Sequence, residues 1–189
     1  MTTQTPPPAL SSAQQPEPWL RGTYSELPAV LRAILHAFDL SREDVVRWTD
    51  GLTEAQLHAA PYGLSPIAFH MRHIARSLGR LLTYAEGNQL NSEQITAMKT
   101  ELDPGISREE LLAEFHRGLE EAAVRVPAFD SADLEKSCAV GKKQLPTSVG
   151  GLLVHLADHT QRHTGQIVAT SKVVRADNAS GSVAVHGLS

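Results

Sequence analysis

Four long stretches of the chain repeat apolar residues at intervals of three and four, the spacing that lines one face of an α-helix. No stretch of useful length alternates apolar and polar residues, as a half-buried strand does. Aromatic residues make up only 5% of the chain, so the core is expected to consist mainly of Leu, Ile, Val and Ala. These features predict an all-α fold, a four-helix bundle. Its helices are expected from about Ser25 to Asp50, Pro66 to Glu86, Ser107 to Val126 and Thr147 to Val174.

Local signals mark the ends of several of these helices. Ser65 suits the N-cap of the second helix, and Gly87 suits the position just after its last turn. A Ser–x–x–Glu capping box at Ser107 begins the third helix. Short additional helices are expected at the capping box that begins with Thr53 and over about 92–102. The bundle is therefore predicted to carry small helical decorations.

The 189 residues suffice for one domain with a sizeable core. Residues 1–18 are rich in Pro, Gln, Thr and Ser and are expected to form a disordered N-terminal arm. Residues 19–175 are expected to form the bundle domain, followed by a flexible tail over 176–189. Between the third and fourth helices, Val140 to Leu145 could be a loop or a short extended segment.

Composition excludes several classes of function. A formal net charge of -4 argues against a nucleic-acid-binding surface, which needs clustered Lys and Arg. No apolar run approaches the roughly 20 residues that span a bilayer, and the N-terminus lacks the pattern of a secretory signal. Cys138 is the single cysteine, so no disulfide within the chain is possible. A reducing, bacterial-type cytoplasm is the expected location.

Histidines in the last predicted helix suggest a metal site. His155, His159 and His163 follow one another at intervals of four. At about 100° per residue, His163 lies about 20° from the centre of the apolar face, His159 about 60° and His155 about 100°. Two inward imidazoles four residues apart can bind zinc, nickel or a similar ion. The same spacing also occurs by chance in helices without a metal, where histidines cap helices or form hydrogen bonds.

A third ligand would have to come from another helix. In the second helix, periodicity favours His70, about 40° from Ile74, over His73, at about 100°. His36 and His116 are expected at the surface or at its boundary with the core. Spacing alone therefore leaves the third ligand open.

Two motifs resemble those of a known superfamily. The segment His73-Ile74-Ala75-Arg76-Ser77 resembles the His-[Ile/Leu]-Ala-x-Ser element of the DinB/YfiT-like superfamily of metal-dependent enzymes. His159 to Ile167 resembles its final-helix motif, His-x-x-x-His followed by Gly-Gln-Ile, and the similarity extends from Trp19 to about Val174. The resemblance implies an up-down-down-up four-helix bundle with a divalent metal bound by His73, His159 and His163. It makes His70 and His155 neighbours of the site or alternative ligands.

The resemblance also implies a range of activities. Relatives include thiol-dependent S-transferases, so a metal-dependent thiol S-transferase or hydrolase acting on a small molecule is expected. Zinc or nickel is the expected ion, with a low-molecular-weight thiol as a potential co-substrate, and the superfamily leaves room for a homodimer. No Asp or Glu is placed as an obvious general base, since Asp158 is predicted to face away from the core. The alternative function is a non-catalytic metal-binding bundle in stress response or protein interaction.

Overall fold

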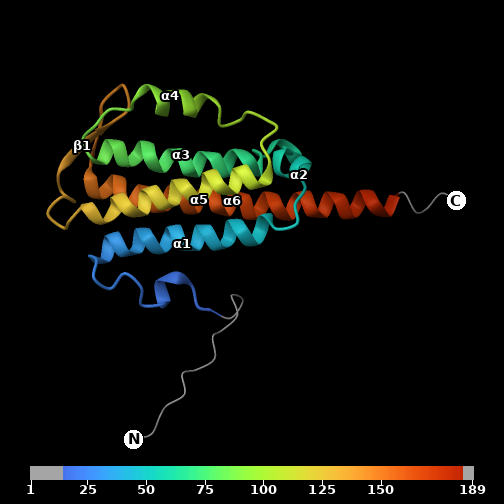
Figure 1. The fold of residues 1–189 in the computed structure, drawn as a ribbon, viewed down its shortest axis with the longest axis horizontal. Coiled ribbons are helices and arrows are strands. Elements are labelled where there is room, and N and C mark those ends of the chain that lie inside the picture. The colour runs from blue at the N-terminus through green and yellow to red at the C-terminus, as the bar shows by residue number, and fades with distance from the viewer. Residues whose placement is uncertain (1–14, 185–189) are drawn as a thin grey trace, which may run out of the picture.

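The computed structural model describes residues 15–184 of the chain, and side chains as far as Asp177. Its four long helices are α1 (Ala29–Thr49), α3 (Ile67–Ala85), α5 (Arg108–Arg125) and α6 (Val149–Ala184). Helices α1 and α6 run in one direction, and α3 and α5 run in the other (Figure 1). The expected all-α bundle of up-down-down-up type is therefore confirmed.

Smaller elements connect the long helices. Helix α4 lies on the outer side of α3, on the crossover between α3 and α5 (Figure 1). A long crossover is needed here because two parallel neighbours cannot be joined by a short turn. The remaining elements are α2 (Glu54–His58), α4 (Ser92–Lys99), β1 (Ser137–Val140), β2 (Leu145–Ser148) and the 3₁₀ turns η1 (Pro18–Leu20), η2 (Pro61–Gly63) and η3 (Val126–Ala128).

The helix-end signals hold with one exception. The capping boxes at Thr53 and Ser107 are both formed, with the side chain and backbone bonds reciprocated. Gly87 has the positive φ of +81° that follows a helix end. Ser65, however, is not the N-cap of α3: Pro66 takes that position, with ψ of 148° and no side-chain bond to the helix. The extended ψ of Pro66 keeps it outside the helix, so α3 begins one residue later than predicted.

Several segments differ from the sequence prediction. Helix α1 begins at Ala29 and not near Ser25, because Pro28 is its N-cap, with an extended ψ of 145°. The segment from Val140 to Leu145, for which the sequence permits a loop or a short extended stretch, belongs to an antiparallel hairpin in which Val140 pairs with Leu145 across a turn. Helix α6 continues to Ala184 and does not end near Val174, because nothing after Val174 interrupts its hydrogen-bond ladder: no proline follows, and a single glycine costs a helix only about 1 kcal/mol. Residues 176–184 are therefore helical, while 1–14 and 185–189 of the predicted arm and tail lie outside the described residues.

Helix α3 is the central helix of the bundle. It packs against both α5 and α6, and α6 packs in turn against α1. Its apolar residues join a continuous core with those of the other long helices, which includes Phe38, Met71, Phe115 and Leu153. The buried face of α6 is partly polar: Thr164 Oγ1 lies 2.6 Å from Ser41 Oγ of α1. Because α3 is buried on most of its circumference, side chains on several of its faces can meet a neighbouring helix.

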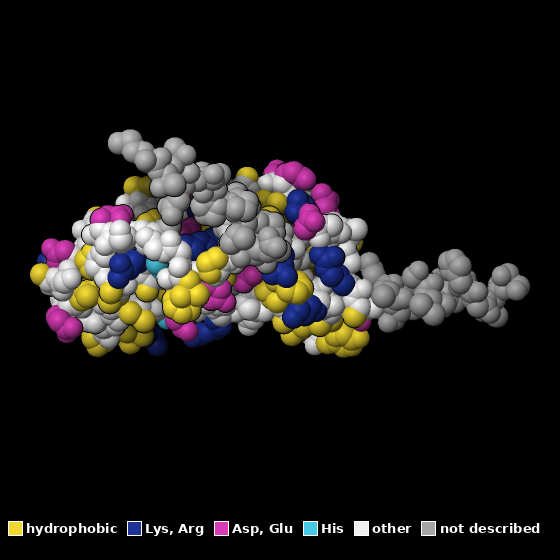
Figure 2. Space-filling view, turned by 90° about the horizontal axis from the view of Figure 1, so that it is seen from below, with side chains coloured by type: hydrophobic (Ala, Val, Ile, Leu, Met, Phe, Trp, Pro, Cys, Tyr) yellow, Lys and Arg dark blue, Asp and Glu magenta, His cyan; other side chains and the backbone are white. Residues whose placement is uncertain are grey.

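The outer surface is mixed in character. Figure 2 shows one face, on which Lys and Arg lie in separate groups among acidic and apolar side chains. The side chains visible on this face form no continuous basic surface of the kind that binds nucleic acid. Within residues 15–184, no helix combines the length and the apolar character that crossing a membrane requires.

Candidate metal centre

Three histidines from two helices converge on one point between α3 and α6. His73 comes from α3, and His159 and His163 come from consecutive turns of α6. Each offers a ring nitrogen, and these nitrogens all lie within 4.8 Å of one another. The ring of His163 has its centroid 4.5 Å from both of the others. The structure thus brings together the three histidines that the motifs select, all of them half-buried.

His73 and His159 also approach each other directly through their ring nitrogens. Their Nε2 atoms are 3.2 Å apart. On the other side of the His73 ring, Nδ1 lies 2.7 Å from Oε2 of Glu101. An ionised carboxylate only accepts hydrogen bonds, so Nδ1 of His73 donates to Glu101, and in a neutral imidazole this leaves the lone pair on Nε2, which faces His159.

The observed separation fits a shared cation. Two metal–nitrogen bonds of about 2.0–2.1 Å hold their nitrogens about 3.4 Å apart at a tetrahedral angle and about 2.9 Å apart at a right angle. The distance of 3.2 Å between the Nε2 atoms lies within these limits. A hydrogen on Nε2 of His159 would fill the same gap without a metal. Geometry alone therefore permits both arrangements.

His70 lies beside this group and contacts His163. Its Nδ1 is 2.9 Å from Nδ1 of His163, and its side chain is almost completely buried. Burial, with a further contribution from neighbouring imidazoles, lowers the pKa values of His70, His159 and His163 to about 4. They are therefore neutral at pH 7, the state in which histidine binds a metal. Helix periodicity favoured His70 over His73 because it identifies the side chains that point to the core, and His70 is buried there. The three histidines of the group meet instead beside the core, where α3 and α6 contact each other.

The other histidines whose side chains the structure describes lie outside the group. His155 is one turn before His159, with a ring centroid 5.4 Å from it, but its side chain is 42% exposed and its nearest ionic partner is Asp158. Asp158 also pairs with Arg162 at the surface, as its predicted outward direction requires. His36 lies elsewhere, on α1, within hydrogen-bond distance of Thr23.

Glu101 is the residue of this site that sequence reasoning missed. It follows α4, 28 positions after His73, and no spacing rule connects the two. Its carboxylate is buried, with one oxygen bonded to His73 and the other 2.7 Å from Arg80 Nη1. Burial acts to raise the pKa of Glu101, but the hydrogen bonds from His73 and Arg80 outweigh it and leave the pKa below its usual value. Glu101 is therefore ionised at neutral pH.

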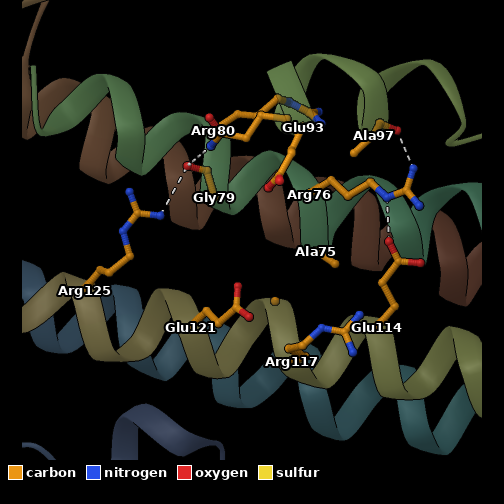
Figure 3. Close-up of a pocket in the computed structure, with 12 residues that line it drawn as sticks. Ala75, Arg76, Gly79, Arg80, Glu93, Ala97, Glu114, Arg117, Glu121 and Arg125 are labelled. Carbon is orange, nitrogen blue, oxygen red and sulfur yellow. Dashed lines mark hydrogen bonds and ion pairs between the residues drawn. The ribbon is translucent and has the colours of Figure 1, made fainter. Parts of the chain in front are cut away.

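A cavity of about 480 Å³ lies between α3, α4 and α5 (Figure 3). Charged side chains of both signs line it, among them Arg76, Glu93, Glu114 and Arg117. None of the described residues that line it is one of the three histidines. The histidine group and this cavity are therefore separate features of the molecule.

A comparison with models of known protein families places this helical bundle in one of them. The family model of the DinB superfamily matches residues 37–167. The chain belongs to the DinB superfamily. The matched region contains all three histidines of the group, and it runs from within α1 to the middle of α6. A search among curated proteins finds no match to this DinB protein.

Proposed function

We propose that this DinB protein binds one divalent metal ion through His73, His159 and His163. The observation that carries the proposal is the convergence of three histidines from two helices, each with a ring nitrogen within 4.8 Å of the others. Zinc or nickel is the proposed ion because imidazole nitrogen suits both. Three protein ligands leave at least one coordination position for another molecule, as in catalytic zinc sites.

Catalysis at this site would use the open position. A divalent ion bound by three neutral imidazoles would lower the pKa of a water or thiol that it binds, which creates a nucleophile near neutral pH. The chain itself supplies orientation: Glu101 fixes the ring of His73, and Phe69 stacks on the same ring at a centroid distance of 5.2 Å. Ser77 Oγ lies 3.4 Å from Nδ1 of His159 and orients that ring. We therefore propose a metal-dependent enzyme of the thiol S-transferase or hydrolase type with a small-molecule substrate.

A second candidate function is metal binding without catalysis. It is favoured by the position of the cavity of about 480 Å³, which is lined by residues other than the three histidines. Cobalt-substituted protein separates the two functions, since its visible spectrum reports the ligands of the ion. Added N-acetylcysteine should change this spectrum if a coordination position is open to a thiol. An unchanged spectrum at saturating thiol would favour the non-catalytic function over a thiol-dependent enzyme.

Metal content tests the site itself. Elemental analysis of the purified protein should find about one divalent ion per chain, and His163→Ala should lose most of it. His155→Ala is the matched control, because His155 lies on the same helix but outside the group. A His163→Ala variant with the metal content of the wild type would contradict the proposed ligands.

A further inference from the structure

Three arginines lie four residues apart along one side of α3: Arg72, Arg76 and Arg80. We call them the arginine clamp, because each contacts the crossover segment from Ser92 to Asp103. Arg72 Nη1 donates to the carbonyl oxygen of Asp103 at 3.2 Å, and Arg80 Nη1 donates to Glu101 at 2.7 Å. Guanidinium groups of α3 thus hold the C-terminal end of the crossover segment.

The middle arginine also connects the clamp to α5. Arg76 donates to the carbonyl oxygen of Ala97 and, at 2.8 Å, to Oγ1 of Thr100. Its Nε donates to Glu114 on α5 at 2.5 Å (Figure 3). Arg72 lies 3.4 Å from the other oxygen of the same carboxylate. Arg72 and Arg76 of the clamp are therefore also held by a carboxylate of α5.

The crossover segment buries a charged residue and leaves its larger apolar residues exposed. From Ser92 to Asp103, Glu101 is the only buried residue. The apolar side chains of Met98 and Leu102 are instead 46% and 67% exposed. Apolar burial normally holds such a crossover in place, whereas burial of a carboxylate is unfavourable unless it is paired. This pattern indicates that the segment is arranged to bring Glu101 inward.

We infer that the arginine clamp positions Glu101 against His73, and that Glu101 is the positioning residue of the histidine centre. This inference depends on the proposed metal-binding function. With Glu101 in place, the hydrogen of His73 stays on Nδ1 and Nε2 faces His159. A carboxylate behind a ligating histidine also raises the basicity of the imidazole, and loss of such a partner typically weakens metal binding about 10–100-fold.

Zinc affinity of a conservative variant tests this role. His73 and Arg80 contact different oxygens of Glu101, and in Glu101→Gln one of these two positions becomes an NH2 group, which donates and cannot accept. We expect this variant to bind zinc about 10–100-fold more weakly than the wild type, by competition with a chromophoric chelator. Glu93→Gln is the matched control, because Glu93 is exposed on α4 and has no ion pair within the described residues; its affinity should stay within about twofold. A folded Glu101→Gln protein with wild-type zinc affinity would overturn the inference.

A second measurement needs no variant. Nitrogen-15 NMR of the metal-free wild-type protein should find the hydrogen of His73 on Nδ1, and a hydrogen on Nε2 would overturn the positioning role. The two proposals fail differently. If His163→Ala loses zinc but Glu101→Gln keeps it, only the role of Glu101 is wrong. If the wild-type protein binds no zinc, the proposed function fails, and the inference fails with it.

Discussion

Gly118 offers a sharp test of how α3 is positioned. This residue of α5 faces Ala75 of α3, and a Cβ added to Gly118 would lie 2.6 Å from Cα and 2.7 Å from Cβ of Ala75. Backbone atoms of a packed helix cannot move away singly. Reaching an ordinary contact of about 3.4 Å would require the helices to separate by roughly 0.8 Å (3.4 − 2.6) at this crossing. Gly118→Ala should therefore destabilise the bundle, although alanine is the better helix former.

Two opposing effects set the magnitude. Overpacking of a tight interior contact costs about 1–3 kcal/mol, and replacing a mid-helix glycine by alanine contributes about 1 kcal/mol in the favourable direction. Helix α3 is buried between α5 and α6 and has little room to retreat, so the cost should lie in the upper part of its range. We expect a net loss of about 1–2 kcal/mol in the free energy of unfolding, or about 2–8 °C in Tm for a domain of this size.

The assay is urea unfolding of metal-free protein, with thermal unfolding as a second measure. Gly165→Ala is the control: Gly165 is an exposed glycine within α6, and an added Cβ meets nothing within 4 Å. That variant should gain up to about 1 kcal/mol, the opposite sign. If Gly118→Ala were as stable as the wild type, or stabilised like the control, the close approach of α3 and α5 would be refuted.

Three further predictions concern protonation, hydrogen bonding and metal. The pKa values of His70, His159 and His163 are about 4 in the folded protein against an ordinary 6.5, so between these pH values the unfolded chain binds more protons than the folded one. The free energy of unfolding of the metal-free protein should therefore decrease as the pH falls from 6.5 to 4, and a flat pH profile in urea unfolding would contradict this. Ser41→Ala should lower the free energy of unfolding by about 0.5–1.5 kcal/mol, because it removes the buried bond to Thr164, whereas no loss would show that the hydroxyl pair contributes little. Zinc at a hundredfold excess over its Kd should stabilise the wild type by about 2.7 kcal/mol in thermal unfolding, and equal stabilisation of His159→Ala would count against the proposed ligands.

The features that could be predicted from the sequence are those that depend on interactions between residues close together in the chain. Helix periodicity and capping boxes act within a few residues, so the four long helices, α2 and the beginning of α5 were predictable from short segments. The pairing of His159 and His163 is equally local, because residues four apart on one helix must lie on neighbouring turns. The continuation of α6 to Ala184 was missed because compositional reasoning treated a Gly- and Ser-containing stretch as a loop.

The third histidine and its partner were decided by tertiary structure. Periodicity measures the direction of the core, and it therefore favoured His70, whereas the choice of His73 depends on which edge of α3 meets α6. In this sequence only the family resemblance pointed to His73. Glu101 had no local signal at all, because it lies 28 positions after His73 on the crossover segment and meets that histidine only in the folded bundle. The sequence by itself determined the helices and the His159–His163 pair, since both depend on the spacing of residues along one helix. The complete group depends on how separate helices pack, and residue spacing within a helix carries no information about that packing.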